Sequence, residues 1–292
     1  MAKLPTRVGA DAHIRPDGSG PERLVVRISL LFPPVRSRDD VGIVPYAREG
    51  RRAVFMKSIH TEVIMAYTIY KPTSAVRGVL FDMDGVILDT EKLYTRFWLE
   101  GAHALGFPMT REQAIGLRGM NLGEAARMIG TYFGSPDYYQ PIKNKRIELM
   151  DAYIAQHGVE PKAGIREILE YLKENHIPRA VCTASPIERV KRYLIPLGLF
   201  DDFDAICTAY DVAQGKPEPD IYLYGAKVLG KTPASCIAIE DSAAGIQSAA
   251  AAGCMATLVP DQDLPDPATL GRVTILADSL LDVIEVIKGC NS

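Results

Sequence analysis

From about residue 75 onward, short apolar runs alternate with stretches of helical periodicity. The apolar runs predict buried strands at residues 76–82, 179–183, 205–208, 236–239, 255–259 and 273–276. The helical patterns between most of them cover residues 164–176, 186–197, 217–229, 242–252 and 279–287. Strands that alternate with helices through short loops predict an α/β fold, a doubly wound parallel sheet with right-handed crossovers and helices on both faces.

The interval 91–162 interrupts this alternation, because it holds helical patterns alone. They cover residues 91–105, 111–117, 122–133 and 141–157. A helical segment of this length, inserted after the first strand, predicts a small α-helical cap domain above the carboxyl end of that strand. The α/β core then consists of residues 76–90 and 163–292.

Residues 1–75 have a different composition, with nine Arg and three Lys against seven acidic residues, and with seven prolines. Their apolar patches are short and interrupted by arginines. We expect a poorly ordered N-terminal extension, because such a segment buries too little surface to offset its ordering entropy. A targeting segment, a basic binding arm, or a translation start at Met56 or Met65 are the alternatives.

Overall composition excludes several functional classes. The 292 residues hold 33 basic and 36 acidic side chains, so the net charge of −3 creates no field for binding nucleic acid or anionic lipid. The five cysteines are scattered, which argues against a disulfide framework or a structural zinc site and fits a reducing compartment. No apolar run reaches the roughly 18 residues that a membrane span needs. We therefore expect a cytoplasmic protein with neither a nucleic-acid partner nor a membrane partner; the oligomeric state stays open.

The first predicted core strand ends in two carboxylates, Asp82 and Asp84, followed by Gly85. Residues two apart in an extended chain point to the same side, so both acids are expected at the crevice where α/β sheets bind ligands. Two adjacent carboxylates need a counterion, and Mg²⁺ prefers oxygen ligands. An exposed acidic turn is the alternative for this motif alone.

Polar residues also follow the second and third of these strands. Thr183, Ala184 and Ser185 precede Pro186, so a hydroxyl there is able to donate to a bound oxyanion beside a helix start. For Ser185, ordinary N-capping is the favoured interpretation. Lys216 precedes Pro217, which holds the lysine backbone extended and then starts a helix, although a solvated surface lysine is the usual alternative.

A further strand ends in Glu240 and Asp241, and Ser242 then caps an alanine-rich helix. Both acids are able to favour the helix N-terminus electrostatically, which is the simple alternative. They are also a third and a fourth carboxylate at an equivalent strand end, as a metal site needs. The conjunction of all four strand-end motifs favours a catalytic site.

These four motifs, in this order, resemble those of the haloacid dehalogenase-like hydrolase superfamily over residues 76–287. The resemblance implies that Asp82 is a nucleophile that forms an aspartyl-phosphate, and that Asp84 is the general acid and base. Thr183 and Lys216 would hold the phosphoryl oxygens, with Ala184 and Ser185 beside them in the substrate site. Mg²⁺ would be bound by the Asp82 side chain, the Asp84 carbonyl and Asp241, with Glu240 helping.

The resemblance favours a phosphatase that acts on a small phosphorylated metabolite, with a β-phosphoglucomutase-like sugar phosphomutase as the alternative. Asp84 disfavours a dehalogenase, since that subgroup lacks this second aspartate. The mutases carry a histidine where Tyr94 stands and a phosphate-binding arginine where Leu122 stands. Arg118 is a candidate substrate contact, with a solvated cation as its alternative. Cap residues that are candidates for selectivity are Tyr94, Trp98, Arg118 and Met120; the substrate itself stays open.

Overall fold

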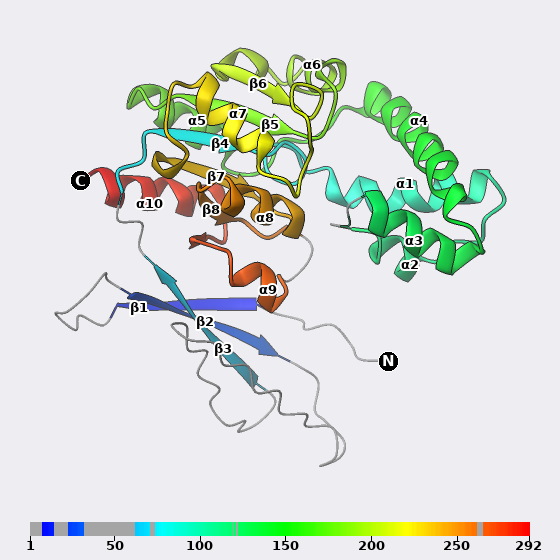
Figure 1. Cartoon of the computed structure of the whole chain (residues 1–292), viewed down its shortest axis with the longest axis horizontal. Coiled ribbons are helices and arrows are strands. Elements are labelled where there is room, and N and C mark those ends of the chain that lie inside the picture. The colour runs from blue at the N-terminus through cyan, green and yellow to red at the C-terminus, as the bar shows by residue number, and fades with distance from the viewer. Residues whose placement is uncertain are drawn as a thin grey trace. The chain divides into compact units, whose positions relative to one another are not determined.

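The structure, a computed structural model, describes residues 8–14, 23–31, 62–70, 74–118, 120, 122–261 and 265–292 (Figure 1). The chain divides into two compact units, Met1–Thr73 and Ser74–Ser292, and each is treated by itself.

The first unit contains three strands, β1 (Val8–Ile14), β2 (Arg23–Leu31) and β3 (Glu62–Tyr70). They form an antiparallel sheet in the order β1-β2-β3. None of these strands was predicted from the sequence, because the interrupted apolar patches were interpreted as too short to order the chain. The expectation of a poorly ordered extension stays a prediction, since most of this unit lies outside the described residues.

The second unit is built on a parallel sheet with the strand order β6-β5-β4-β7-β8-β9. The strands are β4 (Gly78–Phe81), β5 (Arg179–Thr183), β6 (Ala205–Thr208), β7 (Cys236–Glu240), β8 (Met255–Leu258) and β9 (Ile275–Leu276). All six strands predicted for this part of the chain are present, and the predicted α/β class is confirmed. The order of the strands reverses at β4, which pairs with β5 on one side and β7 on the other. Such a switch point is where α/β sheets bind ligands.

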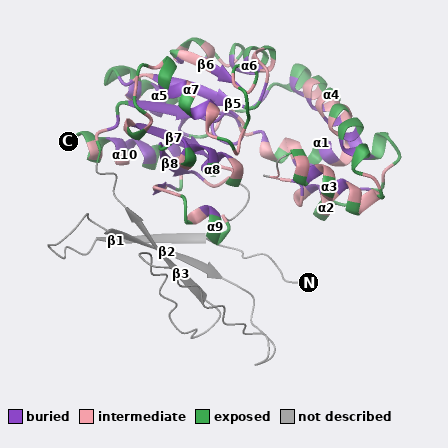
Figure 2. Ribbon diagram, viewed as in Figure 1, coloured by how far each residue is buried: buried purple, intermediate pink, exposed green. Residues whose placement is uncertain are grey.

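The two faces of the sheet bury alternate residues of each strand. Val79 and Phe81 pack with α5 (Ile165–Glu174), α6 (Ile187–Leu194) and α10 (Leu280–Asn291). Leu80, between them, faces the opposite way and packs with α7 (Asp220–Val228) and α8 (Ala243–Ala251). Because both faces are covered, the central strands are buried along their whole length (Figure 2).

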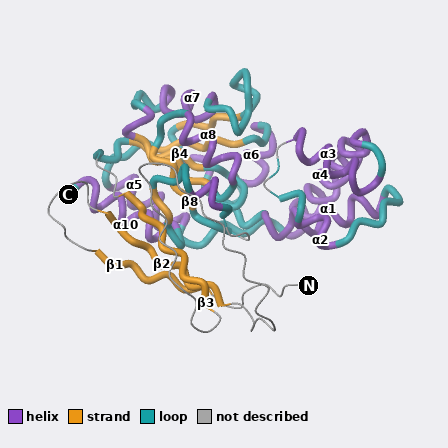
Figure 3. The backbone as a smooth tube through the Cα atoms, turned by 60° about the horizontal axis from the view of Figure 1, so that its bottom comes forward, coloured by secondary structure: helices purple, strands orange, loops and turns teal. Residues whose placement is uncertain are grey.

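The inserted helices are α1 (Glu91–Ala104), α2 (Arg111–Ile115), α3 (Leu122–Phe133) and α4 (Tyr139–His157). They form one helical group with a small core of its own, separate from the two cores of the sheet (Figure 3). At its centre the rings of Trp98 and Tyr139 lie with their centroids 5.9 Å apart. The cap predicted from the sequence is therefore a packed unit rather than a long loop.

Most helix starts lie within two residues of the prediction, and the largest difference is at α7. Helix α6 begins at Ile187 rather than residue 186, and α7 begins at Asp220 rather than residue 217. A short helix, α9 (Pro267–Leu270), was not predicted; it is capped by Asp266, which accepts from two backbone amides. In the described residues, no helix combines the length and the apolarity that a membrane crossing requires.

Candidate active site

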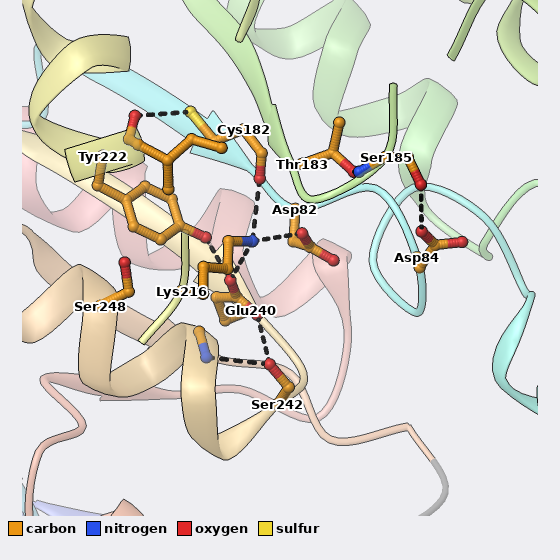
Figure 4. A network of polar contacts seen from close by, with 12 residues as sticks. Asp82, Asp84, Cys182, Thr183, Ser185, Lys216, Tyr222, Glu240, Ser242 and Ser248 are labelled. Carbon is orange, nitrogen blue, oxygen red and sulfur yellow. Dashed lines mark hydrogen bonds and ion pairs between the residues drawn. The ribbon is translucent and has the colours of Figure 1, made fainter. Parts of the chain in front are cut away.

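The site is centred on Asp82, the first residue after β4 (Figure 4). Its backbone amide donates to the Ile239 carbonyl over 3.0 Å, which ties the end of β4 to β7. Thr183 lies at the end of β5 and Glu240 at the end of β7, on the two strands that flank β4. Three of the strand-end motifs therefore meet at the switch point, as parallel strands dictate.

Lys216 joins this group across 134 residues of chain, and its Nζ binds the Oδ1 of Asp82. The same ammonium lies 2.6 Å from Glu240 Oε1 and donates to the Cys182 carbonyl over 2.9 Å. With its side chain 10% exposed, Lys216 is not a solvated surface lysine, so that alternative is wrong. Burial lowers the pKa of this ammonium, but Asp82 and Glu240 outweigh burial and raise the pKa above its usual value.

Asp82 is buried at the centre of these charges. Burial raises the pKa of its carboxyl to about 7, Lys216 opposes the rise, and Glu240 and Asp84 add to it. The Asp82 carboxylate is thus bound by the Lys216 ammonium, in a site where burial and neighbouring acids disfavour further negative charge.

Glu240 is fully buried and accepts hydrogen bonds on both carboxylate oxygens. Oε1 accepts from the Tyr222 hydroxyl, and Oε2 accepts from Ser242 Oγ over 3.1 Å. Ser242 also accepts from the Gly245 amide, so the predicted N-cap of α8 is confirmed. Tyr222 was missed at the sequence level, because nothing in its local pattern separates it from the apolar face of α7.

Asp241 lies against the turn that follows β4. A Cβ added at Gly85 would lie 2.0 Å from Asp241 Oδ2, and Gly85 has a φ of +83°. Both observations require glycine there, which the sequence signalled by the Asp84-Gly85 pair. Burial raises the pKa of Asp241 well above its usual value, and Asp82, Glu91, Glu240 and Asp261 add to the rise.

Three carboxylates fit a divalent cation. Asp82, Glu240 and Asp241 each offer an oxygen, and these oxygens all lie within 4.8 Å of one another. A set of hard oxygen donors with excess negative charge suits Mg²⁺ rather than a softer metal. The Asp84 side chain lies outside this group, so its membership of the metal site, through its backbone carbonyl, stays a prediction.

The Asp84 carboxylate is held by two hydroxyls instead. Thr90 Oγ1 donates to Oδ1 over 2.8 Å, and Ser185 Oγ donates to Oδ2 over 3.4 Å. Ser185 therefore does not cap α6, whose N-cap is Pro186 without a side-chain bond, and the favoured capping interpretation is wrong. The Ser185 amide donates to Thr183 Oγ1 over 3.0 Å, which turns the chain at the end of β5. Thr90 was missed, because its only sequence signal is its place just before a helix.

The remaining predicted residues stand apart from this network. Ala184 is exposed between Thr183 and Ser185, on the open side of the strand end. Arg118 follows α2 in the cap, and its role in substrate binding stays a prediction. Leu122, at the start of α3, is 60% exposed.

Gly245 allows α8 to approach the Glu240 carboxylate, which yields a testable prediction. A Cβ at this position would lie 1.8 Å from Glu240 Cδ, so Gly245→Ala must displace a buried carboxylate that binds Lys216 and Tyr222. We expect a loss of about 3 kcal/mol in the free energy of unfolding, measured by urea denaturation.

Gly289→Ala is the matched control for this variant. Gly289 lies in α10, and no atom is found within 4 Å of its added Cβ. Alanine in a helix is more stable than glycine, so the control should be as stable as the parent or slightly more so. Equal stability of the two variants would contradict the close approach of α8 to Glu240.

A family model described as haloacid dehalogenase-like hydrolase matches residues 76–253. The chain therefore belongs to this family of enzymes, as the strand-end motifs predicted. It is 31% identical to β-phosphoglucomutase of Bacillus subtilis, over 62% of this chain and 82% of that protein. It is 30% identical to hexitol phosphatase A of Escherichia coli, over 74% and 96%. A crystal structure of β-phosphoglucomutase from Clostridium difficile superposes with a TM-score of 0.59 and 25% identity, over 73% and 98%.

Proposed function

We propose that this chain is a Mg²⁺-dependent phosphatase that hydrolyses a small phosphate monoester through an aspartyl-phosphate on Asp82. The observation that carries the proposal is the placement of Asp82. It is buried at the switch point of the sheet, it binds Lys216, and it lies beside Glu240 and Asp241. A carboxylate, a fixed cation and a group of carboxylates able to bind a metal ion, all at one edge of the sheet, are what phosphoryl transfer to an aspartate requires.

In the first step an Asp82 oxygen attacks phosphorus, and the bond from phosphorus to the ester oxygen breaks. The leaving alkoxide takes a proton from Asp84, whose carboxyl is oriented by Thr90 and Ser185. In the second step Asp84 accepts a proton from water, the water oxygen attacks phosphorus, and the bond to Asp82 breaks. Phosphate leaves, and both carboxyl groups return to their starting states.

Charge compensation comes from Lys216 and from the metal site. Asp82, Glu240, Asp241 and the Asp84 carbonyl would hold Mg²⁺, which when bound neutralises negative charge on the phosphoryl oxygens. Lys216 binds Asp82, and the Thr183 hydroxyl and the amides after β5 would bind the remaining oxygens. Tyr222 and Ser242 hold Glu240 in one orientation.

A β-phosphoglucomutase-like activity is the second candidate, favoured by the relatives of that name. A mutase must hold a second phosphate while the intermediate reacts, and the mutases place an arginine of the cap loop for this. Leu122, at the position of the expected arginine, is an exposed apolar residue that binds no phosphate. Tyr94 replaces the expected histidine and is covered by the Arg146 guanidinium, 4.4 Å from the ring centroid. These two departures favour hydrolysis over phosphoryl return to a sugar.

The test is a phosphate-release assay over a panel of sugar, polyol and nucleoside monophosphates with Mg²⁺. We expect release of free phosphate from at least one ester class and its loss when EDTA removes the metal, with recovery on adding Mg²⁺. Conversion of β-glucose 1-phosphate to the 6-phosphate with little free phosphate would establish the mutase instead. Hydrolysis at full rate in EDTA would contradict the metal-dependent mechanism.

A further inference from the structure

Three basic side chains gather where the cap meets the core, outside the network around Asp82. Lys143 and Arg146 lie three residues apart on α4, so they share one side of that helix. Arg189 lies on α6 of the core. Lys143, Arg146 and Arg189 are called the cation cluster below. None of the three was singled out from the sequence, because a basic residue on a helix is usually a solvated one.

Arg146 is the most unusual member of the cation cluster. It is 7% exposed, and its Nε has no hydrogen-bond partner. Its guanidinium carbon lies 4.4 Å from the Tyr94 ring centroid and 4.8 Å from that of Trp98. Among the described residues, no carboxylate lies within ion-pair distance of Arg146. Two aromatic rings compensate only part of the cost of burying a guanidinium, so an anion beside it would stabilise it further.

Arg189 forms only a long ion pair with Asp151. Its Nε lies 3.6 Å from Asp151 Oδ1 and makes no hydrogen bond. The same carboxylate accepts from Arg192 over 2.7 Å and from the Tyr193 hydroxyl over 2.8 Å. The Asp151 carboxylate is thus bound mainly by Arg192 and Tyr193, so it neutralises the cation cluster only in part.

The lowered pKa of Lys143 agrees with an excess of positive charge around it. Burial lowers the pKa of its ammonium, and both Arg146 and Arg189 lower it further. No acidic group is among the causes, which is the behaviour of a lysine that faces other cations rather than a carboxylate. Lys143 therefore faces both arginines, whereas Arg189 also lies near Asp151 and Asp84, which raise its pKa.

A short path along α1 connects the cation cluster to the catalytic end of the sheet. Thr90 donates to the Asp84 carboxylate. Tyr94, whose ring contacts the Arg146 guanidinium, follows four residues later, and its amide donates to the Thr90 carbonyl. Four residues of helix rise ~6 Å. Burial raises the pKa of the Tyr94 hydroxyl well above its usual value, Asp84 adds to the rise, and Arg146 and Arg189 oppose it, so Tyr94 lies near both the acid and the arginines.

From this geometry we infer that the cation cluster is a subsite for a second anionic group of the substrate, a phosphate or a carboxylate at the far end of the carbon chain from the ester phosphate. The inference rests on the proposed function, because it takes Asp82 and Lys216 to bind the ester phosphate. The distal anion stays on the product. A guanidinium held against two rings presents its remaining N–H groups in a fixed direction, which suits recognition of a planar carboxylate or a phosphate.

A purely structural role for Arg146 is the competing explanation. Gly101 on α1 approaches the Arg146 backbone so closely that a Cβ would lie 2.8 Å from its nitrogen. Arg146 could therefore serve only to join α1 to α4. That role predicts equal effects of a substitution on all substrates, whereas a subsite predicts effects that depend on the charge of the substrate tail.

The experiment compares three five-carbon phosphate esters that differ in the group at the far end. Ribitol 5-phosphate has a neutral end, 5-phosphoribonate a carboxylate, and ribulose 1,5-bisphosphate a phosphate. For Arg146→Gln we expect the ratio of kcat/KM for an anionic-tailed ester to that for the neutral ester to fall about 10- to 100-fold, mainly through KM. Arg189→Gln should lower the same ratio. Whether the ratio falls for the carboxylate-ended or for the phosphate-ended ester distinguishes the two anions.

Arg127→Gln is the matched control, an exposed arginine on α3 of the same cap, and its ratio should equal that of the parent. Thermal unfolding checks that Arg146→Gln is folded; if it is not, Arg189→Gln alone decides. An unchanged ratio in a folded variant, with hydrolysis intact, overturns the subsite and leaves the phosphatase standing. Absence of phosphate release from every ester in the parent overturns the proposed function instead.

Discussion

Asp82→Asn is expected to reduce phosphate release by about 10⁴-fold or more, the largest effect of any single change in this chain. The amide has the size of the carboxyl group, but its oxygen carries no charge and forms no stable phosphoryl ester. The variant should also fail to bind BeF₃⁻, a mimic of the phosphoryl group, in the presence of Mg²⁺. Single-turnover phosphate release and fluorine NMR of the bound mimic measure the two effects.

This loss of activity should occur without loss of the fold. Burial raises the pKa of Asp82 to about 7 from 3.8, so between these values the folded chain keeps a proton that the unfolded chain has released. That difference lowers the stability of the parent as the pH rises through this interval. The neutral variant lacks this cost, and in metal-free buffer at pH 8 its melting temperature should equal or exceed that of the parent.

Asp137→Asn provides the control for Asp82→Asn, because Asp137 is an acidic residue on the cap surface. Its activity should match the parent. If Asp82→Asn kept more than a tenth of the parent activity, Asp82 would not be the nucleophile, and the aspartyl-phosphate mechanism would have to be abandoned.

Lys216→Met should have the second largest effect, since this lysine binds two buried carboxylates at once. Its ammonium contacts Asp82 and lies 2.6 Å from Glu240 Oε1. Methionine preserves the apolar length of the side chain but leaves both carboxylates without their cation. We expect hydrolysis to fall about 10²- to 10³-fold and the free energy of unfolding to fall by about 3–5 kcal/mol in metal-free buffer.

Added Mg²⁺ separates the two consequences of Lys216→Met. Ion binding to the native state stabilises it, and the unpaired carboxylates of the variant should gain more from the ion than those of the parent. The melting temperature should therefore rise further with Mg²⁺ in the variant, while hydrolysis stays low. Lys227→Met, at an exposed position of α7, is the control and should leave both quantities unchanged. A variant as stable as the parent without metal would contradict a buried pairing role for Lys216.

The strands of the core could be predicted from the sequence because each one is a short apolar run that ends in a polar residue. Parallel strands buried on both faces need continuous apolar runs, and residues such as Leu80 and Phe81 satisfy this with no information from elsewhere in the chain. Residues 23–31 could not be assigned in the same way. Their apolar run is interrupted by Arg27, and the pairing that places it in a sheet is with Ala66 of β3, far along the chain.

The grouping of the candidate catalytic residues could be predicted as well, since each follows a strand and parallel strands end at one edge. Asp82, Thr183 and Glu240 therefore meet by topology alone. The capping interpretation of Ser185 was wrong for a physical reason. The Ser185 hydroxyl is able to bind either the nearby helix end or the Asp84 carboxylate, which is 101 residues away in the chain. The local sequence shows only the nearby helix end.

By itself, the sequence determined the strand ends, the order of the four motifs and the helical insertion, because these depend on local periodicity and on residue type. The tertiary structure alone decided which side chains pair across long separations. It placed Tyr222 against Glu240 and Gly245 beside the Glu240 carboxylate, and it buried Arg146 against two aromatic rings without an acidic partner among the described residues. Such pairings depend on the packing of whole helices, and no pattern within one segment contains that information.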